Sequence, residues 1–230
     1  MNVLAIGAHP DDIEIFMFGT LAALAARGDQ LAYVIVTDGT RGGRGAPGHL
    51  RATRKAEAEA AAGLLNADLH FLDLPDGELV ADATLVKALK GAIERASPDL
   101  IITHAANDYH GDHRALSEGV RIAASFAAPV LHCDTLRGVG ASPTHYVDIT
   151  AHVEAKDAAI RCHASQDPDR FVSASRVLSA FRASQANAPE GSHAEAFRFE
   201  PVFPFVDIRD LLPKAPMVRP VVNRASVSRG

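Results

Sequence analysis

The chain has 230 residues, of which 47% are hydrophobic and 22% charged, and its formal net charge is −5 at pH 7. This length and apolar content suit one packed α/β domain and exclude a largely disordered chain. The acidic balance provides no basic field that would attract nucleic acid or an anionic membrane.

Targeting signals and cysteines bear on the cellular setting. The sequence shows no basic-then-apolar signal before the first predicted strand, and no apolar run of the ~18 to 20 residues that span a bilayer. The two cysteines, Cys133 and Cys162, form no Cys-x-x-Cys pair, so we expect buried free thiols. We therefore expect a cytoplasmic protein that contacts neither nucleic acid nor a membrane.

Apolar segments typical of strands alternate with segments whose apolar spacing is near that of a helix. The predicted strands are 2–8, 30–37, 68–73, 100–104 and 129–134, and the predicted helices are 16–27, 49–65, 82–96 and 113–126. Unbroken apolar strands joined by helical crossovers predict a Rossmann-like, doubly wound α/β core over about 1–135. Its sheet should be mostly parallel, with helices on both faces.

The remaining chain is less regular. We predict a short strand at 146–150 and helices at 151–165 and 170–186. Proline and glycine become frequent from Ala188 onward, and 213–230 has no helical or alternating period. We expect a single domain over 1–212, followed by a C-terminal tail or arm, 213–230, that could pack on another subunit.

Two polar clusters follow predicted strands. His9 to Asp12 comes after the first strand, and the segment from His104 to His113 comes after the fourth. Ligands of open α/β sheets bind beyond the carboxyl ends of the strands, where the strand order reverses. In the common order 3-2-1-4-5 the first and fourth strands flank that point, so we expect the two clusters to face each other.

The residue types in these clusters favour a metal site. An imidazole and two adjacent carboxylates are costly to bury without a positive partner. His9 and Asp12 could meet one ion, and a histidine of the later cluster could complete a three-ligand site with an open position. Zinc suits such a set best, although iron, cobalt or manganese would also fit.

The groups left over suit acid–base chemistry. Only one of Asp11 and Asp12 fits the ion comfortably, so the other could accept a proton from metal-bound water. The later histidine that does not bind the ion could stabilise an oxyanion or protonate a leaving nitrogen, and Asp112 could raise its pKa. Each cluster alone is also consistent with a capped turn or a surface histidine. Their coincidence at one edge of the sheet favours the metal site.

These residues resemble the PIG-L/LmbE-like zinc-dependent N-deacetylases. The two most specific motifs are Ala8-His9-Pro10-Asp11-Asp12 and Tyr109-His110-Gly111-Asp112-His113-Arg114. Weaker motifs follow the order of the family: Gly19-Thr20-Leu21-Ala22, Thr37-Asp38-Gly39, Arg54 with Glu57, His163-Ala164-Ser165-Gln166 and Glu195-Ala196-Phe197.

The resemblance implies a hydrolase that removes an N-acyl group, usually acetyl, from an amino sugar or a similar small molecule. It implies His9, Asp12 and His113 as the metal ligands and Asp11 as the general base. His110 would stabilise the oxyanion or donate a proton, with Asp112 orienting it. Members often form homo-oligomers, so a homo-oligomer is expected here too.

Other candidate substrate contacts have open alternatives. The resemblance suggests Arg54 for the substrate side, whereas its spacing from Glu57 also suits an intrahelical ion pair. The Gly-rich stretch 39–48 is consistent with a mobile surface loop or with a lid that brings a guanidinium to the substrate. His163 could line the site or cap a helix end. The polar loop residues that could bind sugar hydroxyls are Asp38, Arg41, Arg44 and Asp108.

The sequence departs from the family pattern at two places. Phe16-Met17-Phe18 stands where many relatives have glycine, and Gly111 stands where many have proline. Large side chains at the start of this helix predict a narrowed or more apolar subsite at Phe16 and Phe18.

Two further functions remain open. The chain could cleave the amide of a non-sugar metabolite or thiol conjugate, or it could be a non-catalytic sugar- or nucleotide-binding module. Dinucleotide binding is disfavoured because the first strand runs into Gly7-Ala8-His9-Pro10 and not into a Gly-x-Gly-x-x-Gly loop.

Overall fold

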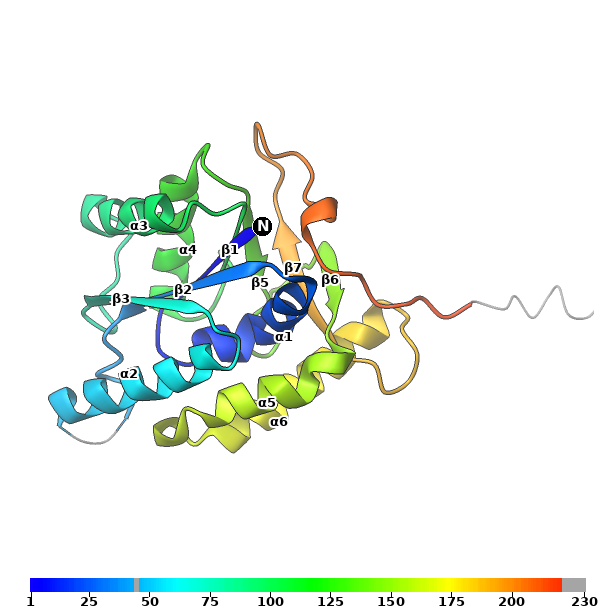
Figure 1. The fold of residues 1–230 in the computed structure, drawn as a ribbon, viewed down its shortest axis with the longest axis horizontal. Coiled ribbons are helices and arrows are strands. Elements are labelled where there is room, and N and C mark those ends of the chain that lie inside the picture. Colours follow the sequence, from blue (N-terminus) through cyan, green and yellow to red (C-terminus); the bar gives the residue numbers. More distant parts are fainter. Residues whose placement is uncertain (44–45, 221–230) are drawn as a thin grey trace, which may run out of the picture.

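The computed structural model describes residues 1–43 and 46–220, and within them seven strands form one sheet (Figure 1). The strands are β1 Asn2–Gly7, β2 Gln30–Thr37, β3 Asp68–Leu74, β4 Leu100–Thr103, β5 Val130–Cys133, β6 His145–Asp148 and β7 Ala194–Phe199. The α-helices are α1 Asp12–Arg27, α2 Pro47–Gly63, α3 Ala83–Ala96, α4 Gly111–Ala124, α5 Val153–Arg161 and α6 Pro168–Gln185.

The strand order is β3-β2-β1-β4-β5-β7-β6. Strands β1 to β5 run parallel, and β7 pairs antiparallel with both β5 and β6. The predicted Rossmann-like α/β sheet and its 3-2-1-4-5 core are therefore confirmed. The order reverses between β1 and β4, which places their carboxyl ends at the switch point.

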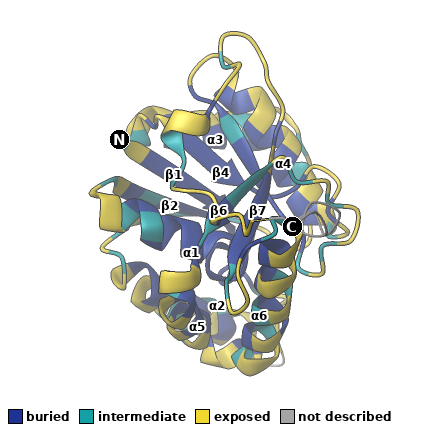
Figure 2. Cartoon of the chain, turned by 90° about the vertical axis from the view of Figure 1, so that its right-hand side faces the viewer, coloured by how far each residue is buried: buried dark blue, intermediate teal, exposed yellow. Residues whose placement is uncertain are grey.

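Apolar side chains of the central strands divide between the two faces of the sheet. In β1, Val3 and Ala5 join a core cluster with α1, α2, α5 and α6, whereas Leu4 and Ile6 join a cluster with α3 and α4. Figure 2 shows the dark-blue strands enclosed between helices whose outward faces are exposed. Burial on both faces explains why these strands read as continuous apolar runs.

Four helices begin earlier than predicted, and two of them, α1 and α4, carry residues of the candidate site. Helix α1 begins at Asp12, not at residue 16, and α4 begins at Gly111, not at residue 113. Apolar spacing cannot detect a polar first turn, so the prediction started each helix at its apolar part. The difference matters because Asp12 and His113 thereby lie in the first turns of two helices on opposite faces of the sheet.

Strand β7 was not predicted, because it lies in the segment expected to be irregular. Its small residues Ala194 and Ala196 give a weak alternating signal, and its position between β5 and β6 depends on tertiary pairing. It brings Glu195 against α1, where the carboxylate accepts the N–H groups of Gly19 and Thr20 at 2.9 and 2.8 Å.

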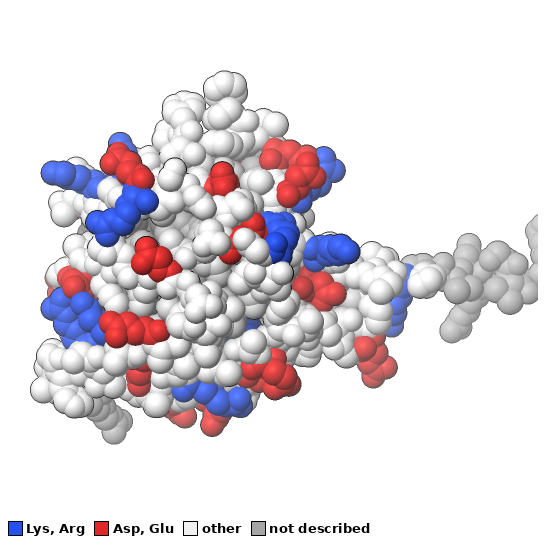
Figure 3. Space-filling model, viewed as in Figure 1, with Lys and Arg blue, Asp and Glu red and all other residues white. Residues whose placement is uncertain are grey.

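The C-terminal segment 213–220 has no helix or strand, and it is tied to the body by backbone bonds from Asp148 N to Lys214 O and from Arg219 N to Asn187 O. The rest of the predicted tail, 221–230, lies outside the described residues. Cys133 and Cys162 are free, the first buried and the second half-buried. Among the described helices, none is long and apolar enough to cross a membrane. Positive and negative side chains are interspersed on the face in Figure 3.

Candidate metal centre

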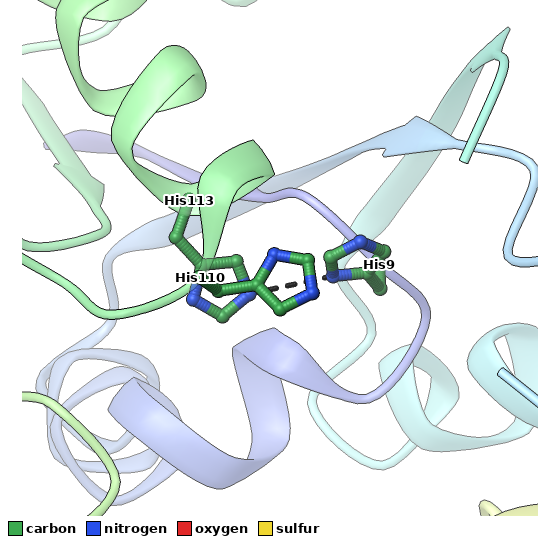
Figure 4. Close-up of side chains that lie close together, drawn as sticks. All are labelled: His9, His110 and His113. Carbon is green, nitrogen blue, oxygen red and sulfur yellow. Dashed lines mark hydrogen bonds between the residues drawn. The ribbon is translucent and has the colours of Figure 1, made fainter. Parts of the chain in front are cut away.

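The turn between β1 and α1 holds the first polar cluster. Asp12 N lies 3.3 Å from His9 O, and Asp11 adopts a left-handed backbone with φ 111°. A non-glycine residue in such a conformation costs about 1–3 kcal/mol and persists only where its surroundings hold it. The second cluster occupies the loop after β4 and the start of α4. Figure 4 shows His110 and His113 from this cluster beside His9.

Three side chains bring ligand atoms to one point. His9 Nδ1 lies 3.2 Å from Asp12 Oδ2, and His113 Nε2 lies 3.3 Å from both His9 Nδ1 and Asp12 Oδ1. A tetrahedral ion with bonds of roughly 2.0–2.2 Å places its ligands about 3.4 Å apart. The three side chains are buried, and their spacing fits a divalent transition metal.

Further His and Asp side chains surround this point. Three overlapping groups have ligand atoms within 4.8 Å of one another: His9, His110 and His113; Asp12, His104 and His113; His9, Asp76 and Asp112. The described residues therefore offer more potential ligands than the predicted set, with His9 and His113 each in two groups.

Charges keep Asp12 ionised. Burial would raise the pKa of its carboxyl, but the charges of His113 and His9 and a hydrogen bond with His104 hold that pKa well below its usual value. The fully buried His104 places Nε2 3.1 Å from Asp12 Oδ2 and stacks on the His113 ring at 3.7 Å. Burial and the neighbouring His113 lower the pKa of His104 to about 4, so this ring is neutral.

Asp108 fixes the ring of His113. Its Oδ2 lies 3.1 Å from His113 Nδ1, which directs Nε2 toward Asp12 and His9. Burial lowers the pKa of His113, but Asp12 and Asp108 outweigh it and raise the pKa to about 9. Predicted as a substrate contact, Asp108 instead lies behind the histidine with its side chain fully buried.

Asp11 belongs to none of these ligand groups and pairs with Arg54. Its Oδ1 lies 3.2 Å from Arg54 Nη2, and Arg54 Nη1 donates to Gly39 O at 3.0 Å. Burial raises the pKa of Asp11 to about 6 although the Arg54 charge lowers it. A carboxylate that titrates near neutrality suits a general base. The alternative intrahelical pair of Arg54 is absent, because Glu57 instead accepts the N–H and hydroxyl of Ser165.

His110 lines the cavity above this point. Its Nδ1 accepts the backbone N–H of Asp112 at 3.2 Å, which leaves the ring proton of the neutral imidazole on Nε2. Its ring lies 4.8 Å from the ring of His9. Burial and the neighbouring His113 lower its pKa. The ring is therefore a neutral hydrogen-bond donor at pH 7.

Asp112 does not orient His110 through its carboxylate, as the sequence reading expected. Its Oδ2 lies 3.1 Å from His9 Nε2, and its two oxygens accept the N–H groups of Gly77 and Leu79. As the second residue of α4 it points from the helix start toward the β3–α3 loop, so its carboxylate reaches His9 and only its backbone reaches His110.

A cavity of about 340 Å³ is lined by Asp11 and by three histidines, His9, His110 and His113. Its apolar lining residues are Ile15, Phe16, Leu136 and Phe171, and its outer polar ones are Arg41, Tyr109 and Gln166. Phe16 thus lies where the apolar subsite was expected. Phe18 does not, because its fully buried side chain packs with Ala22 and Ala159 on the opposite side of α1.

Of the other predicted substrate residues, two line the cavity and two do not. Arg41 and Arg54 line the cavity, and Arg41 forms an exposed ion pair with Glu78. Asp38 accepts the N–H and hydroxyl of Thr40, and His163 places Nε2 3.0 Å from the buried carboxylate of Glu14. Neither lines the cavity. Arg44 lies outside the described residues.

The sequence reading missed Asp76. This residue follows β3 in a Pro75-Asp76-Gly77 turn, and its Oδ1 lies 3.2 Å from His9 Nε2. The signal that could have identified it is the one that marks the other two clusters: Asp76 is a polar residue just beyond the carboxyl end of a parallel strand. Tyr109 and Gln166 belong to the motifs named above and also line the cavity, which the sequence did not predict.

The Rossmann-like sheet and the His and Asp side chains clustered beyond β1 and β4 fit the class of deacetylase-like hydrolases. The chain belongs to the PIG-L family: the model of that family, described as GlcNAc-PI de-N-acetylase, matches residues 4–124.

Relatives catalyse more than one reaction. The diacetylchitobiose deacetylase of Thermococcus kodakarensis is 30% identical over 189 residues, which are 73% of this chain and 71% of that protein. The 4-oxalmesaconate hydratase of Pseudomonas putida is 26% identical over 191 residues, 72% of this chain and 74% of that protein. The solved N,N'-diacetylchitobiose deacetylase of Pyrococcus horikoshii, complexed with an inhibitor, has a TM-score of 0.77 and 27% identity, covering 91% of this chain and 88% of that one.

Proposed function

We propose that the chain is a metal-dependent hydrolase that removes an N-acyl group, with acetyl the first candidate, from an amino sugar or a sugar-containing small molecule. The observation that carries this proposal is the mutual spacing of the ligand atoms on His9, Asp12 and His113, at a cavity that the carboxylate of Asp11 also lines. Three protein ligands leave room for water and substrate, and zinc is the ion that we propose.

An ion held by His9, Asp12 and His113 would polarise the amide carbonyl and lower the pKa of water. Asp11 would accept the proton of the attacking water. Two observations support this role. Arg54 Nη2 lies 3.2 Å from Asp11 Oδ1 and holds the carboxylate in place, and the pKa of Asp11 is about 6. The base is thus ionised at pH 7 and still basic enough to take a proton.

His110 would act on the other side of the carbonyl carbon. Its neutral ring carries the proton on Nε2 and could donate a hydrogen bond to the developing oxyanion. Asp11, once it has taken up a proton from the water, could deliver that proton to the leaving nitrogen as the C–N bond breaks, while the neutral His110 ring donates only a hydrogen bond. The cavity walls suggest how an amide would lie, with its acyl group against Phe16 and Leu136 and its amine side toward Arg41 and Gln166.

Elemental analysis and an Asp11→Asn variant test the proposal. We expect about one transition-metal ion per purified chain, release of acetate from N-acetylglucosamine or diacetylchitobiose, and a loss of about 10²–10⁴-fold in kcat for Asp11→Asn. Asp38→Asn is a control, because Asp38 contacts Thr40 and not the cavity. A metal-free protein, or an Asp11→Asn variant with unaltered activity, would exclude the proposed mechanism.

A second candidate is water addition to an unsaturated acid, which the hydratase relative of Pseudomonas putida supports. Parallel assays on N-acetyl sugars, non-sugar N-acyl amides and a 2-hydroxymuconate-type acid separate the candidates. Cleavage of non-sugar amides alone would favour a metabolite amidase, and hydration alone would favour the second candidate. Ligand binding without turnover of any of them would favour a binding module.

We also propose a single domain over residues 1–212, a C-terminal arm from 213 onward, and assembly into a homo-oligomer. The contacts of Lys214 and Arg219 with the body support an arm that starts on its own domain. Light scattering of the full chain and of a chain truncated after Leu212 would test both ideas.

A further inference from the structure

Both ring nitrogens of His9 have polar partners. Nδ1 faces Asp12 Oδ2 and His113 Nε2 at 3.2 and 3.3 Å. On the other edge of the ring, Nε2 lies 3.1 Å from Asp112 Oδ2 and 3.2 Å from Asp76 Oδ1. A neutral imidazole has one proton and one lone pair, so only one nitrogen can bind an ion while the other donates a hydrogen bond.

The two carboxylates at Nε2 are held by backbone donors. Asp112 Oδ2 accepts the N–H of Gly77 at 2.7 Å, and its Oδ1 accepts that of Leu79 at 3.2 Å. Asp76 Oδ2 accepts the N–H of Arg41 at 2.8 Å. Both side chains are buried. Two buried carboxylates at one point are costly unless donors satisfy them, and a proton on His9 Nε2 is the donor they share.

We propose that Asp76 and Asp112 are positioning residues that hold the proton of His9 on Nε2 and so present the lone pair of Nδ1 to the ion. This inference rests on the proposed function, because it assumes that His9, Asp12 and His113 bind a metal. Asp76, which follows β3, thereby joins the residues of the candidate site, and Asp112 acts on His9 and not on His110. A carboxylate on the far nitrogen fixes the tautomer of a metal-binding histidine and raises its basicity.

Asp76 also connects the loop that follows β2 to His9. One of its oxygens faces His9, and the other accepts the N–H of Arg41 in the loop that follows β2. The loop that carries a cavity guanidinium is therefore tied to a proposed metal ligand through one side chain. Loss of the Asp76 charge should disturb metal binding first, and substrate binding only through the loop.

Metal affinity of Asp76→Asn and Asp112→Asn tests the proposal without any substrate. We expect each variant to bind Zn²⁺ about 10–100-fold more weakly than the wild type, measured by competition with a chromophoric chelator. The visible absorption of the Co²⁺-loaded variants should also change, because the orientation of a ligand changes. Asp73→Asn is the matched control: this nearby carboxylate pairs with Lys55 and Arg51, and its removal should leave Zn²⁺ affinity unchanged.

A measurement on the wild type covers the case in which a variant fails to fold. In ¹⁵N spectra of the Zn²⁺-loaded protein, the His9 ring should carry its proton on Nε2, and a proton on Nδ1 would overturn the proposal. Unchanged Zn²⁺ affinity and Co²⁺ absorption in folded Asp76→Asn would overturn the role of Asp76. A rise in KM alone would also overturn it, since this would identify Asp76 as a substrate contact.

The outcomes separate this inference from the proposed function. If the wild type binds Zn²⁺ and both variants bind it weakly, but no amide is cleaved, the hydrolase proposal fails and the positioning role stands. If amides are cleaved and Asp76→Asn binds Zn²⁺ normally, only the positioning role fails. A wild type that binds no transition metal refutes both.

Discussion

Replacing Glu195 with Gln tests whether the Glu195-Ala196-Phe197 motif anchors α1. The carboxylate is buried, accepts two backbone N–H groups of α1, and pairs with the buried ammonium of Lys156 at 2.6 Å. Gln keeps the size but removes the charge, so the Lys156 ammonium would remain buried without its counter-charge. Breaking a buried pair in this way costs about 3–5 kcal/mol.

Lys156→Met should cost less than Glu195→Gln. After that change Glu195 keeps the N–H groups of Gly19 and Thr20, each a charge-assisted hydrogen bond worth about 1.5–3 kcal/mol. Glu195→Gln, in contrast, leaves an unpaired cation. With a urea slope of about 3 kcal/mol/M, a loss of about 3 kcal/mol lowers the unfolding midpoint by about 1 M.

The assay is urea unfolding followed by circular dichroism for the wild type, both single variants and the double variant. We expect the double variant to be more stable than the sum of the single losses predicts, by at least about 1 kcal/mol. Strict additivity, or a larger loss for Lys156→Met than for Glu195→Gln, would refute the reasoning. In that case the motif would anchor α1 by packing alone.

Three further predictions concern the cavity. Arg54→Met should lower kcat about 10–100-fold with little change in Zn²⁺ content, since Arg54 contacts Asp11 and no proposed ligand; an unchanged kcat would show that Asp11 needs no such partner. Phe16→Ala should widen the acyl preference, as measured by kcat/KM for acetyl and butyryl amides. Phe18→Ala should leave that preference unaltered and cost about 3–5 kcal/mol of stability in urea unfolding. Zn²⁺ affinity should rise with pH through about 9 and beyond, because the pKa values of His113, about 9, and His9, about 12, are raised and protons therefore compete with the ion; a pH-independent affinity would contradict this assignment.

The position of the candidate site could be predicted because it depends on one short-range sequence signal and on the usual topology of parallel sheets. Each polar cluster directly follows an apolar strand, and the topology of parallel sheets then brings the ends of β1 and β4 together. His9 and His113, more than a hundred residues apart in sequence, are in contact for this reason.

The partners of the site residues could not be predicted, because they depend on loop conformations and helix starts. Asp112 reaches His9 only because α4 begins at Gly111 and the 76–79 loop folds over it. Asp108 was expected near the substrate as a polar loop residue and His163 as part of a motif, yet each is buried against another side chain. Phe18 differs from Phe16 only in helical phase, which turns its side chain into the core.

Strand β7 has a consequence for the order in which the molecule can form. It lies between β5 and β6, yet it is the last strand within residues 1–43 and 46–220, so β6 cannot join the sheet until residues 194–199 are available. Long-range pairing of this kind is slow because the intervening chain must first be brought together. Glu195 on β7 also supplies the anchor for α1, whose first turn carries Asp12. During synthesis, the turn near the N-terminus therefore acquires this support only after the chain has been made as far as Phe199.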